Sequence, residues 1–462
     1  METVSTAFRR RLADVPAFGV GLSVDVYSPD LLELDAQLDA AGLPCGYFEV
    51  FKATAPALAG VRRRMATADL AYHGEGIWLM DPALFRHGET AQEVATVTEH
   101  ARILQTPWIN LECASKAIAS YQFGTYLPPP FTPEMADLVA RNASALQERL
   151  RPLLLLELPP LTYFGYGILS PALFFRRIAQ QAPCGFVLDI GHMWTQWRYG
   201  AEGVPLQEWL QAFLRDFPLE RVVEIHIAGL ALHPGDDENL YDDPPRWLDA
   251  HPATIPEVLF EMLDVVLPQP RLSSLRGAAL EVDGKDIDTI VREFGDFRNR
   301  FGRRVDAVIG GPFNAAAEHV SSPDMAVTDG VGASLRRYAE TVIGARPIVS
   351  GSGWYGDLAR YRRIYLPHEI LVWGGELNAM FPETCRALDR HDVSLAEFVA
   401  WWFQQPRADL QSYDFFLLKL DRFVAFVTDR LSELRAIAVD EAELLRSGYL
   451  EACDHIGDEV RV

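Results

Sequence analysis

The sequence predicts an α/β protein built on a (β/α)8 TIM barrel and followed by a mainly helical region. Eight short apolar runs recur through the first 300 residues, and each is followed by a helical pattern or a long loop. Buried parallel strands have continuous apolar sequences because helices cover both faces of the sheet. A doubly wound sheet is the alternative, but it does not require eight runs. The expected strands lie at residues 18–24, 45–51, 70–74, 108–113, 153–158, 185–190, 222–229 and 278–282.

The segments between these runs carry the signals of amphipathic helices. Residues 28–42 have a helical pattern, with Ser28 as the candidate N-cap and Gly42 as the stop after the last turn. In residues 132–150 the apolar side chains recur at helical spacing. This alternation of strand and helix supports the barrel.

The pattern changes near residue 300. Residues 309–334 are rich in Gly, Ala, Ser and Pro and indicate a linker. Residues 335–462 contain strongly helical stretches, and we interpret the aromatic residues 401–403 as helix-bundle core rather than as a docking patch. We therefore expect a catalytic barrel domain in residues 1–305, a linker in 306–334 and a helical accessory domain in 335–462.

The net charge and the cysteine content limit the classes of binding partner and the cellular compartment that we expect. Forty-two Lys and Arg against 64 Asp and Glu give a formal net charge of −22, which predicts no nucleic-acid partner because such a surface repels phosphate backbones. The five cysteines are sparse and form neither a disulfide framework nor a CxxC metal motif. With no signal peptide and no apolar run of membrane-spanning length, we expect a cytoplasmic protein that has no membrane partner.

Metal-capable side chains fall where a barrel places its functional groups. The C-terminal ends of the strands meet at one mouth, and seven consecutive strands end here in a carboxylate or an imidazole. The loop after the seventh strand adds two more such residues. The complete set is Glu49, His73, Glu112, Glu157, Asp189 with His192, His226, Asp249 with His251, and Glu281.

Taken singly, these residues have ordinary explanations, since His73 could be a core histidine and Asp189 could cap a helix. Taken together, they form a cluster that lacks an organic cation, because the nearest obvious one is Lys52. Such a cluster repels itself unless divalent metal ions neutralise it. We therefore predict a metal site whose ligands are all the strand-end and loop residues above except Glu49.

The ligand types indicate which metals fit. Imidazole with carboxylate suits Fe, Zn or Mn rather than Ca or Mg, and the ligands outnumber the four of a closed zinc site. We predict two or three such ions, with Glu157 as the bridging carboxylate. Glu157, Asp189 and Glu281 are the candidate catalytic residues. Such clusters activate water for hydrolysis or, with iron, use dioxygen as a co-substrate, and the ligands alone do not decide between these reactions.

An ordered series of segments resembles the multinuclear non-haem iron-dependent oxidase family, which includes the oxidases of methanobactin biosynthesis. The segments are FEVFKATA (48–55), YHGEGIWLMDP (72–82), YLPPPFTPEMADLVARNASALQERL (126–150), LLLLELPPLTYF (153–164), VLDIGHMW (187–194), VVEIHIAG (222–229), LDAHPATIPEVLF (248–260) and ALEVD (279–283). The resemblance implies a (β/α)8 barrel with two or three irons that uses dioxygen to modify cysteine or other side chains of a ribosomally made peptide. By this resemblance, the matching ligand positions are His73, Glu157, Asp189, His226, His251 and Glu281.

The sequence also departs from that family. Glu112 replaces a usual histidine, Leu158 replaces the Asn of a Glu-Asn pair, and Leu230 replaces the histidine that closes a His-x-Ala-Gly-His motif. The family's Asp-x-Asn-Asn becomes an Asp-x-x-His at residues 189–192. This Asp-x-x-His, the following Asp-x-His and the final Glu are also the pattern of xylose-isomerase-like barrels, which include endonuclease IV and sugar isomerases or epimerases.

Three functions therefore stay open. The leading one is an iron-dependent oxidase of a peptide or a small amino-acid-like substrate, with a partner protein or the region after the barrel delivering that substrate. The second is a metal-dependent sugar isomerase, epimerase or hydrolase. The third is a non-catalytic scaffold that retains the barrel. We expect residues 335–462 to pack beside the barrel mouth and shape substrate access, and a remote association module is the alternative.

Overall fold

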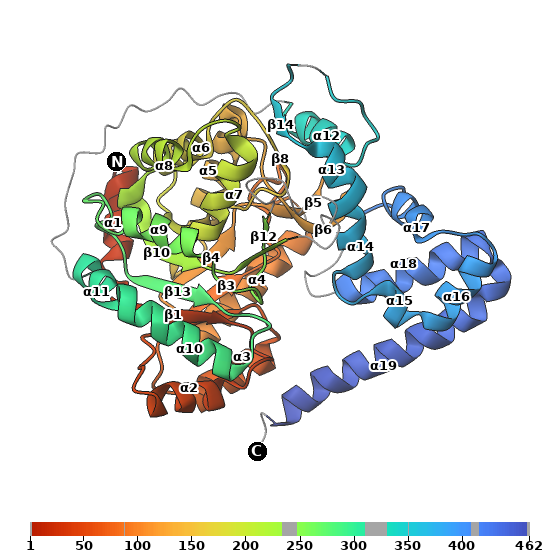
Figure 1. Cartoon of the computed structure of the whole chain (residues 1–462), viewed down its shortest axis with the longest axis horizontal. Helices are drawn as coiled ribbons and strands as arrows, with labels where there is room; N and C mark the ends of the chain where they lie inside the picture. Colours follow the sequence, from red (N-terminus) through yellow and green to blue (C-terminus); the bar gives the residue numbers. More distant parts are fainter. Residues whose placement is uncertain are drawn as a thin grey trace.

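The computed structural model describes residues 2–86, 88–232, 247–309, 330–349, 351–407 and 415–459. The barrel strands are β1 (Gly19–Val24), β2 (Phe48–Phe51), β3 (Leu70–Gly74), β4 (Trp108–Glu112), β7 (Leu153–Glu157), β9 (Gly185–Asp189), β10 (Val222–Ile227) and β13 (Gly277–Glu281). Within the described ranges these eight parallel strands close into a barrel in the order β1-β13-β10-β9-β7-β4-β3-β2. Figure 1 shows strands of this barrel with helices around them. Each apolar run expected from the sequence forms one of them, so the predicted barrel is confirmed.

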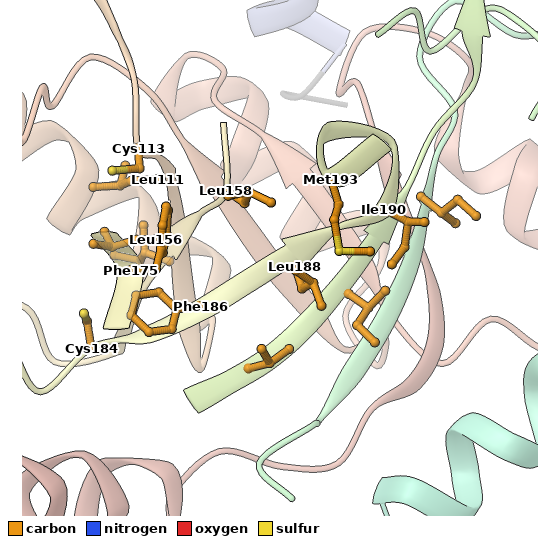
Figure 2. Packing of buried hydrophobic residues seen from close by; sticks show 14 of the residues in the cluster. Leu111, Cys113, Leu156, Leu158, Phe175, Cys184, Phe186, Leu188, Ile190 and Met193 are labelled. Carbon is orange, nitrogen blue, oxygen red and sulfur yellow. The ribbon is translucent and has the colours of Figure 1, made fainter. Parts of the chain in front are cut away.

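Helices surround the strands, as the buried parallel sheet requires. They are α2 (Leu31–Ala40), α3 (Ala55–Arg64), α4 (Gly88–Leu104), α5 (Pro133–Gln147), α6 (Pro171–Ala179), α7 (Ile190–Gly200), α8 (Leu206–Asp216), α9 (Glu257–Val266), α10 (Ile287–Phe297) and α11 (Arg303–Ile309), with α1 (Val4–Leu12) ahead of the first strand. Because side chains alternate along a strand, Leu156 packs among the helices whereas Leu155 and Glu157 face the barrel interior. Figure 2 shows this outer layer, in which the rings of Phe175 and Phe186 lie 5.2 Å apart.

Helix α2 corrects one expectation. Asp30, not Ser28, is its N-cap, and its carboxylate accepts the backbone N–H groups of Leu32 and Glu33 at 2.9 and 3.0 Å. A capping side chain must directly precede the first helical residue to reach these N–H groups, and Ser28 lies too far back. The stop at Gly42 is confirmed by its positive φ of 68°.

Short hairpins extend the loops at the mouth of the barrel. One contains β5 (Ser115–Ile118) and β6 (Tyr121–Leu127) and follows β4, and another contains β11 (Leu230–Leu232) and β12 (Trp247–Asp249) and follows β10. A third pair joins distant parts of the chain, because β8 (Phe164–Tyr166) pairs with β14 (Trp354–Gly356). The C-terminal region therefore contributes a strand beside the loop that follows β7.

The C-terminal region is mainly helical, as predicted. It contains α12 (Val331–Val342), α13 (Leu358–Arg360), the π-helical turn η4 (Tyr361–Tyr365), α14 (Leu366–Val372), α15 (Leu377–Met380), α16 (Pro382–Arg390), α17 (Leu395–Trp402), α18 (Phe415–Arg430) and α19 (Arg435–Glu459). The buried apolar side chains up to Leu366 belong to the same cluster as the barrel helices. Those from Ile370 onward form a second cluster, in which Trp402 is fully buried, so the core interpretation holds for this tryptophan.

Most of the expected linker, residues 310–329, lies outside the described residues. Among the residues that are described, none of the helices is long and apolar enough to cross a membrane. Cys45, Cys113, Cys184 and Cys385 are free thiols.

Candidate metal centre

The strand-end residues expected from the sequence come together at the mouth of the barrel. Strand pairing sets their positions, since Glu112 lies opposite Glu157 and Asp189 lies opposite His226. His192 lies in the first turn of α7, directly after β9. The strand-end residues and His192 are buried, whereas the side chains of Asp249 and His251 are each 21% exposed. The whole predicted ligand set therefore occupies one region, buried on the barrel side and open toward the loops.

Four buried side chains form the first group. One ligand atom from each of Glu157, Asp189, His226 and Glu281 lies within 4.8 Å of the others. Nδ1 of His226 is 3.4 Å from Glu157 Oε1 and 3.4 Å from Glu281 Oε1. Three carboxylates and one imidazole at this spacing suit one transition-metal ion.

A second group shares Glu157 with the first. It contains His73, Glu112 and Glu157, again with ligand atoms within 4.8 Å of one another. His73 Nε2 lies 3.2 Å from Glu157 Oε2, whereas the first group approaches Oε1 of the same carboxylate. Glu157 thus presents one oxygen to each group, which is the arrangement of a bridging ligand.

A third group lies toward the open side. Asp249 Oδ2 is 3.2 Å from His192 Nε2 and 3.4 Å from His251 Nε2. The same nitrogen of His251 is 3.5 Å from Glu281 Oε2, so this group adjoins the first one. The Asp-x-x-His and Asp-x-His patterns therefore converge in space.

Two hydrogen bonds orient the imidazoles of this third group. His192 Nδ1–H donates to the backbone carbonyl of Leu158 at 2.7 Å. His251 Nδ1–H donates to the carboxylate of Asp283 at 2.9 Å. In the neutral ring each bond would keep the proton on Nδ1, so Nε2, which points at Asp249, is the nitrogen available to a metal, and this is how metal-binding histidines are usually held. Asp283 was not expected from the sequence, although its position two residues after Glu281 was a signal.

Asp189 has two roles in the structure. Its Oδ1 accepts the backbone N–H of His192 and so caps α7, as its ordinary interpretation suggested. Its Oδ2 is buried and has no hydrogen-bond partner. The cap therefore fixes the carboxylate while one oxygen stays directed at the first group.

The residues fit metal ions on the evidence of unsatisfied buried atoms. Among the described residues, buried oxygens or nitrogens without a hydrogen-bond partner include Glu112 Oε1, Asp189 Oδ2, His226 Nδ1, Asp249 Oδ1 and Glu281 Oε2. Buried polar atoms are normally paired, so this concentration at one place requires a ligand.

The charges of the site point the same way. Burial raises the pKa of Asp189 to about 7, and burial together with Glu157 raises the pKa of Glu112. Although burial opposes it, the carboxylate of Glu157 and its neighbours raise the pKa of His73 to about 9. Asp189 and Glu112 thus resist ionisation, and the imidazole of His73 takes up a proton where a divalent cation would otherwise supply the charge.

The nearby lysines already have acidic partners. Lys52 forms a buried ion pair with Glu93, and its Nζ donates to the backbone carbonyl of Glu75 at 2.9 Å. Lys116 Nζ lies 2.7 Å from Glu75 Oε1. Because these two lysines are paired with Glu93 and Glu75, their charges do not neutralise the carboxylates of the three ligand groups.

The C-terminal region reaches the same mouth. Tyr365 Oη lies 3.4 Å from Thr125 Oγ1 of β6. Burial and the carboxylate of Glu369 raise the pKa of this tyrosine, and Asp249 of the third group adds to the shift. Lys116 Nζ lies 4.7 Å from the ring centroid of Trp373. The segment from η4 to the end of α14 therefore forms one side of the site.

Two further residues around the centre were not expected from the sequence. Asn110 lies on β4 two residues before Glu112, so the two side chains share a face of the strand. Its Nδ2–H donates to Glu157 Oε2. Glu224 is a fully buried carboxylate within the apolar run of β10, and its place inside that run was the available signal. At the family's closing histidine position, Leu230 is buried and lies beside Gly191.

Comparisons with known proteins agree with the barrel. A model of the RiPP precursor modification enzyme family MbnB/TglH/ChrH matches residues 19–295. A UPF0276 protein of Paraburkholderia phytofirmans is 26% identical over 233 residues, covering 48% of this chain and 70% of the relative. The UPF0276 protein RB0508 of Rhizobium meliloti is 24% identical over 229 residues, covering 48% and 69%.

Solved structures are less similar to the chain in amino-acid sequence. A xylose isomerase domain protein from Planctomyces limnophilus is 15% identical with a TM-score of 0.38, covering 63% of this chain and 98% of the other. Endonuclease IV from Thermus thermophilus is 18% identical with a TM-score of 0.36, covering 60% and 99%. Similarity at this level indicates no shared function.

Proposed function

This chain belongs to the RiPP precursor modification enzyme family MbnB/TglH/ChrH, and from that membership we propose that it is an iron-dependent oxidase that uses dioxygen to modify a peptide. RiPP denotes a ribosomally made, post-translationally modified peptide. The observation that carries the proposal is the shared carboxylate of Glu157, whose two oxygens face two separate ligand groups. Bridged ions of this kind supply more than one electron at one site, which oxidation by dioxygen requires.

We assign three ion positions from the three ligand groups. The first would be held by Glu157, Asp189, His226 and Glu281, the second by His73, Glu112 and Glu157, and the third by His192, Asp249 and His251. When bound, iron supplies open coordination positions and redox electrons for dioxygen chemistry. Leu230, which replaces the family's histidine, lies beside Gly191, the residue that precedes His192.

The protein's own groups hold this centre in place and shield part of it. The carbonyl of Leu158 and the carboxylate of Asp283 keep His192 and His251 in one tautomer. The ring of Phe51 lies 5.0 Å from the ring of His73 and stacks on His251 at 6.5 Å. This apolar wall keeps water from one side of the reacting centre.

The substrate is proposed to be a peptide, with cysteine as the candidate site of modification, or a small amino-acid-like molecule. We assign substrate access to the segment that carries Tyr365, Glu369 and Trp373, because the charge of Asp249 in the third group acts on Tyr365. Delivery of the peptide would then involve the C-terminal helices or a separate partner protein.

A second function has one specific observation in its favour. The close contact of His192, Asp249 and His251 reproduces the Asp-x-x-His and Asp-x-His pattern of xylose-isomerase-like barrels. A sugar isomerase, epimerase or hydrolase would use the same carboxylates with redox-inert ions, and Glu157 or Glu281 would then move protons. This alternative predicts full activity with zinc or manganese and no oxygen consumption.

Anaerobic purification followed by exposure to dioxygen tests the proposal. The iron-loaded protein is mixed with a cysteine-containing peptide, and oxygen uptake is measured together with the mass of the peptide. We expect oxygen uptake coupled to a mass change, with both lost in zinc-loaded protein. Iron-loaded protein that neither oxidises in air nor consumes oxygen with any peptide would overturn the oxidase assignment, and a metal-free chain would favour the scaffold.

A further inference from the structure

A further acidic group, separate from the three ligand groups, lies in the barrel beneath the proposed ions. Glu49 of β2 and Glu224 of β10 are fully buried, and with His226 they place ligand atoms within 4.8 Å of one another. This spacing has two possible meanings. It is either a further metal site or a support that holds His226 from behind.

The ring of His226 separates the two sides. Its Nδ1 faces Glu157 and Glu281 at 3.4 Å each, whereas its Nε2 lies 3.2 Å from Glu49 Oε1 and 3.6 Å from Glu224 Oε1. Neither nitrogen has a hydrogen bond of ordinary geometry, although the ring is fully buried. A buried imidazole needs a partner on each nitrogen, and this ring has a ligand group on one side and a carboxylate on the other.

The chemistry of imidazole prevents Nδ1 and Nε2 of His226 from both binding a metal ion while the ring keeps its proton. When one ring nitrogen binds a metal, the other carries the proton and is a hydrogen-bond donor. A second ion at Nε2 would require loss of that proton as well. Nε2 of His226 therefore has an N–H to donate, and Glu49 Oε1 is the nearest acceptor.

The two acids are also held by protein donors. Glu224 accepts the Tyr47 hydroxyl at one oxygen and Trp108 Nε1–H at the other, the latter at 2.8 Å. Glu49 Oε1 accepts the hydroxyl of Ser23 at 3.3 Å. Both oxygens of Glu224 and Oε1 of Glu49 are thus anchored by the protein, and of the four oxygens only Glu49 Oε2 lacks a hydrogen-bond partner.

The floor of the barrel closes this layer from below. The rings of Tyr47 and Trp108 each pack on Phe18, at 5.2 and 4.9 Å. These side chains belong to a buried apolar cluster in the lower barrel interior. The acidic layer therefore lies between an apolar floor and the proposed centre, in the position of a support.

We propose that Glu49 is a positioning residue that accepts the Nε2–H of His226 and thereby fixes Nδ1 as the nitrogen that binds metal. The acceptor holds the plane of the ring and makes Nδ1 a stronger donor. Glu224, anchored by Tyr47 and Trp108, closes the layer behind it. This inference rests on the metal centre of the proposed function but not on iron or on dioxygen.

Cobalt(II) titration of the metal-depleted full-length chain tests the proposal through the number of ions bound, their affinity against a chelator and the visible absorption bands. Glu49→Ala removes the acceptor, and we expect the wild-type number of ions with affinity lowered about 10- to 100-fold and shifted bands. Glu49→Gln keeps a carbonyl acceptor and should restore most of the affinity and the wild-type bands. Ser23→Ala, which removes only a donor to Glu49, is the matched control and should resemble the wild type.

Two results would overturn the proposal. One ion fewer in both Glu49 variants would make Glu49 a metal ligand, and unchanged affinity and bands in Glu49→Ala would remove its positioning role. If Glu49→Ala does not fold, Glu49→Gln decides alone by ion number, with a full complement supporting the proposal and a missing ion contradicting it. A wild-type chain that binds cobalt as expected but consumes no oxygen when it is loaded with iron would refute the oxidase while leaving this inference intact.

Discussion

Glu112 and Glu157 lie directly opposite each other on the neighbouring strands β4 and β7, and both contribute to the ligand group that contains His73. Like charges at directly opposite positions destabilise a sheet, and burial strengthens the repulsion. Burial and the carboxylate of Glu157 accordingly raise the pKa of Glu112. A bound cation removes the repulsion, so this pair couples barrel stability to metal binding.

The first prediction concerns the residue that replaces a histidine of the family. A carboxylate is a harder donor than imidazole and adds a negative charge, so Glu112 should favour manganese or a lower iron potential. Glu112→His should raise the iron-to-manganese ratio after loading from an equimolar mixture. Metal analysis of the two proteins measures this ratio. An identical ratio and identical spectra would mean that Glu112 does not contact the ions.

The second prediction concerns the start of the C-terminal region. Tyr166 and Phe164 of the barrel pack on Trp354 and Tyr361, with ring centroids 4.5 and 4.7 Å apart. A chain that ends after Val305 loses these contacts and should unfold at a lower temperature and aggregate, because it exposes buried aromatic surface.

A chain that ends after Trp373 is the matched comparison. It keeps the packed aromatic pairs and the side of the mouth that carries Tyr365, so it should bind metal like the full chain. Turnover that falls while metal is retained would assign substrate delivery to the distal helices. A Val305 truncation with the full-length melting temperature and full turnover would contradict both the packing argument and the role in access.

The third prediction uses a titratable group away from the ligands. The side chain of His100 accepts a hydrogen bond from the hydroxyl of Tyr72 at 2.8 Å, and burial, with a smaller effect of Lys52, lowers its pKa to about 4. An unfolded histidine binds its proton near pH 6.5, so this group's stabilising effect is complete above pH 6.5 and is lost as the pH falls toward 4. Relative to His100→Gln, the wild type should lose about 2 kcal/mol of unfolding free energy over that interval.

Denaturant unfolding of both proteins at several pH values measures this difference. The carboxylates that titrate in the same range are common to both proteins, so their effects cancel in the comparison. If the stability curves of the two proteins run parallel from pH 6.5 to pH 4, His100 takes up its proton at the same pH in the folded and the unfolded protein, and the prediction is wrong.

The barrel could be predicted from the sequence because buried parallel strands and their ends leave a strong local pattern. The run of leucines before Glu157 marks a strand with helices on one face and the barrel interior on the other, and the polar residue marks its mouth. The boundaries of the regions stay a prediction.

Other features depend on contacts that no local pattern encodes. Glu224 is two residues from a predicted ligand, but a register shift between Val222 and Glu224 alters which side chains face inward. The pairing of β8 with β14 joins segments far apart in the chain, and so does the contact of Lys116 with Trp373. The N-cap of α2 was misplaced because Ser28 and Asp30 are both good capping residues, and only the structure shows where the first turn begins.

The central claim is that Glu157 bridges ions in a multinuclear centre, and metal content per chain tests it most directly. Anaerobically purified wild-type protein should carry two or three transition-metal ions, mostly iron. Glu157→Gln should lose most of them, because removing one bridging charge weakens two ions at once. Glu220→Gln is the control, because Glu220 lies just before β10 and so at the end of the barrel away from the mouth. This variant should keep the full complement of ions. A wild-type chain with one ion or none, or a Glu157→Gln chain with the wild-type number, would contradict the account.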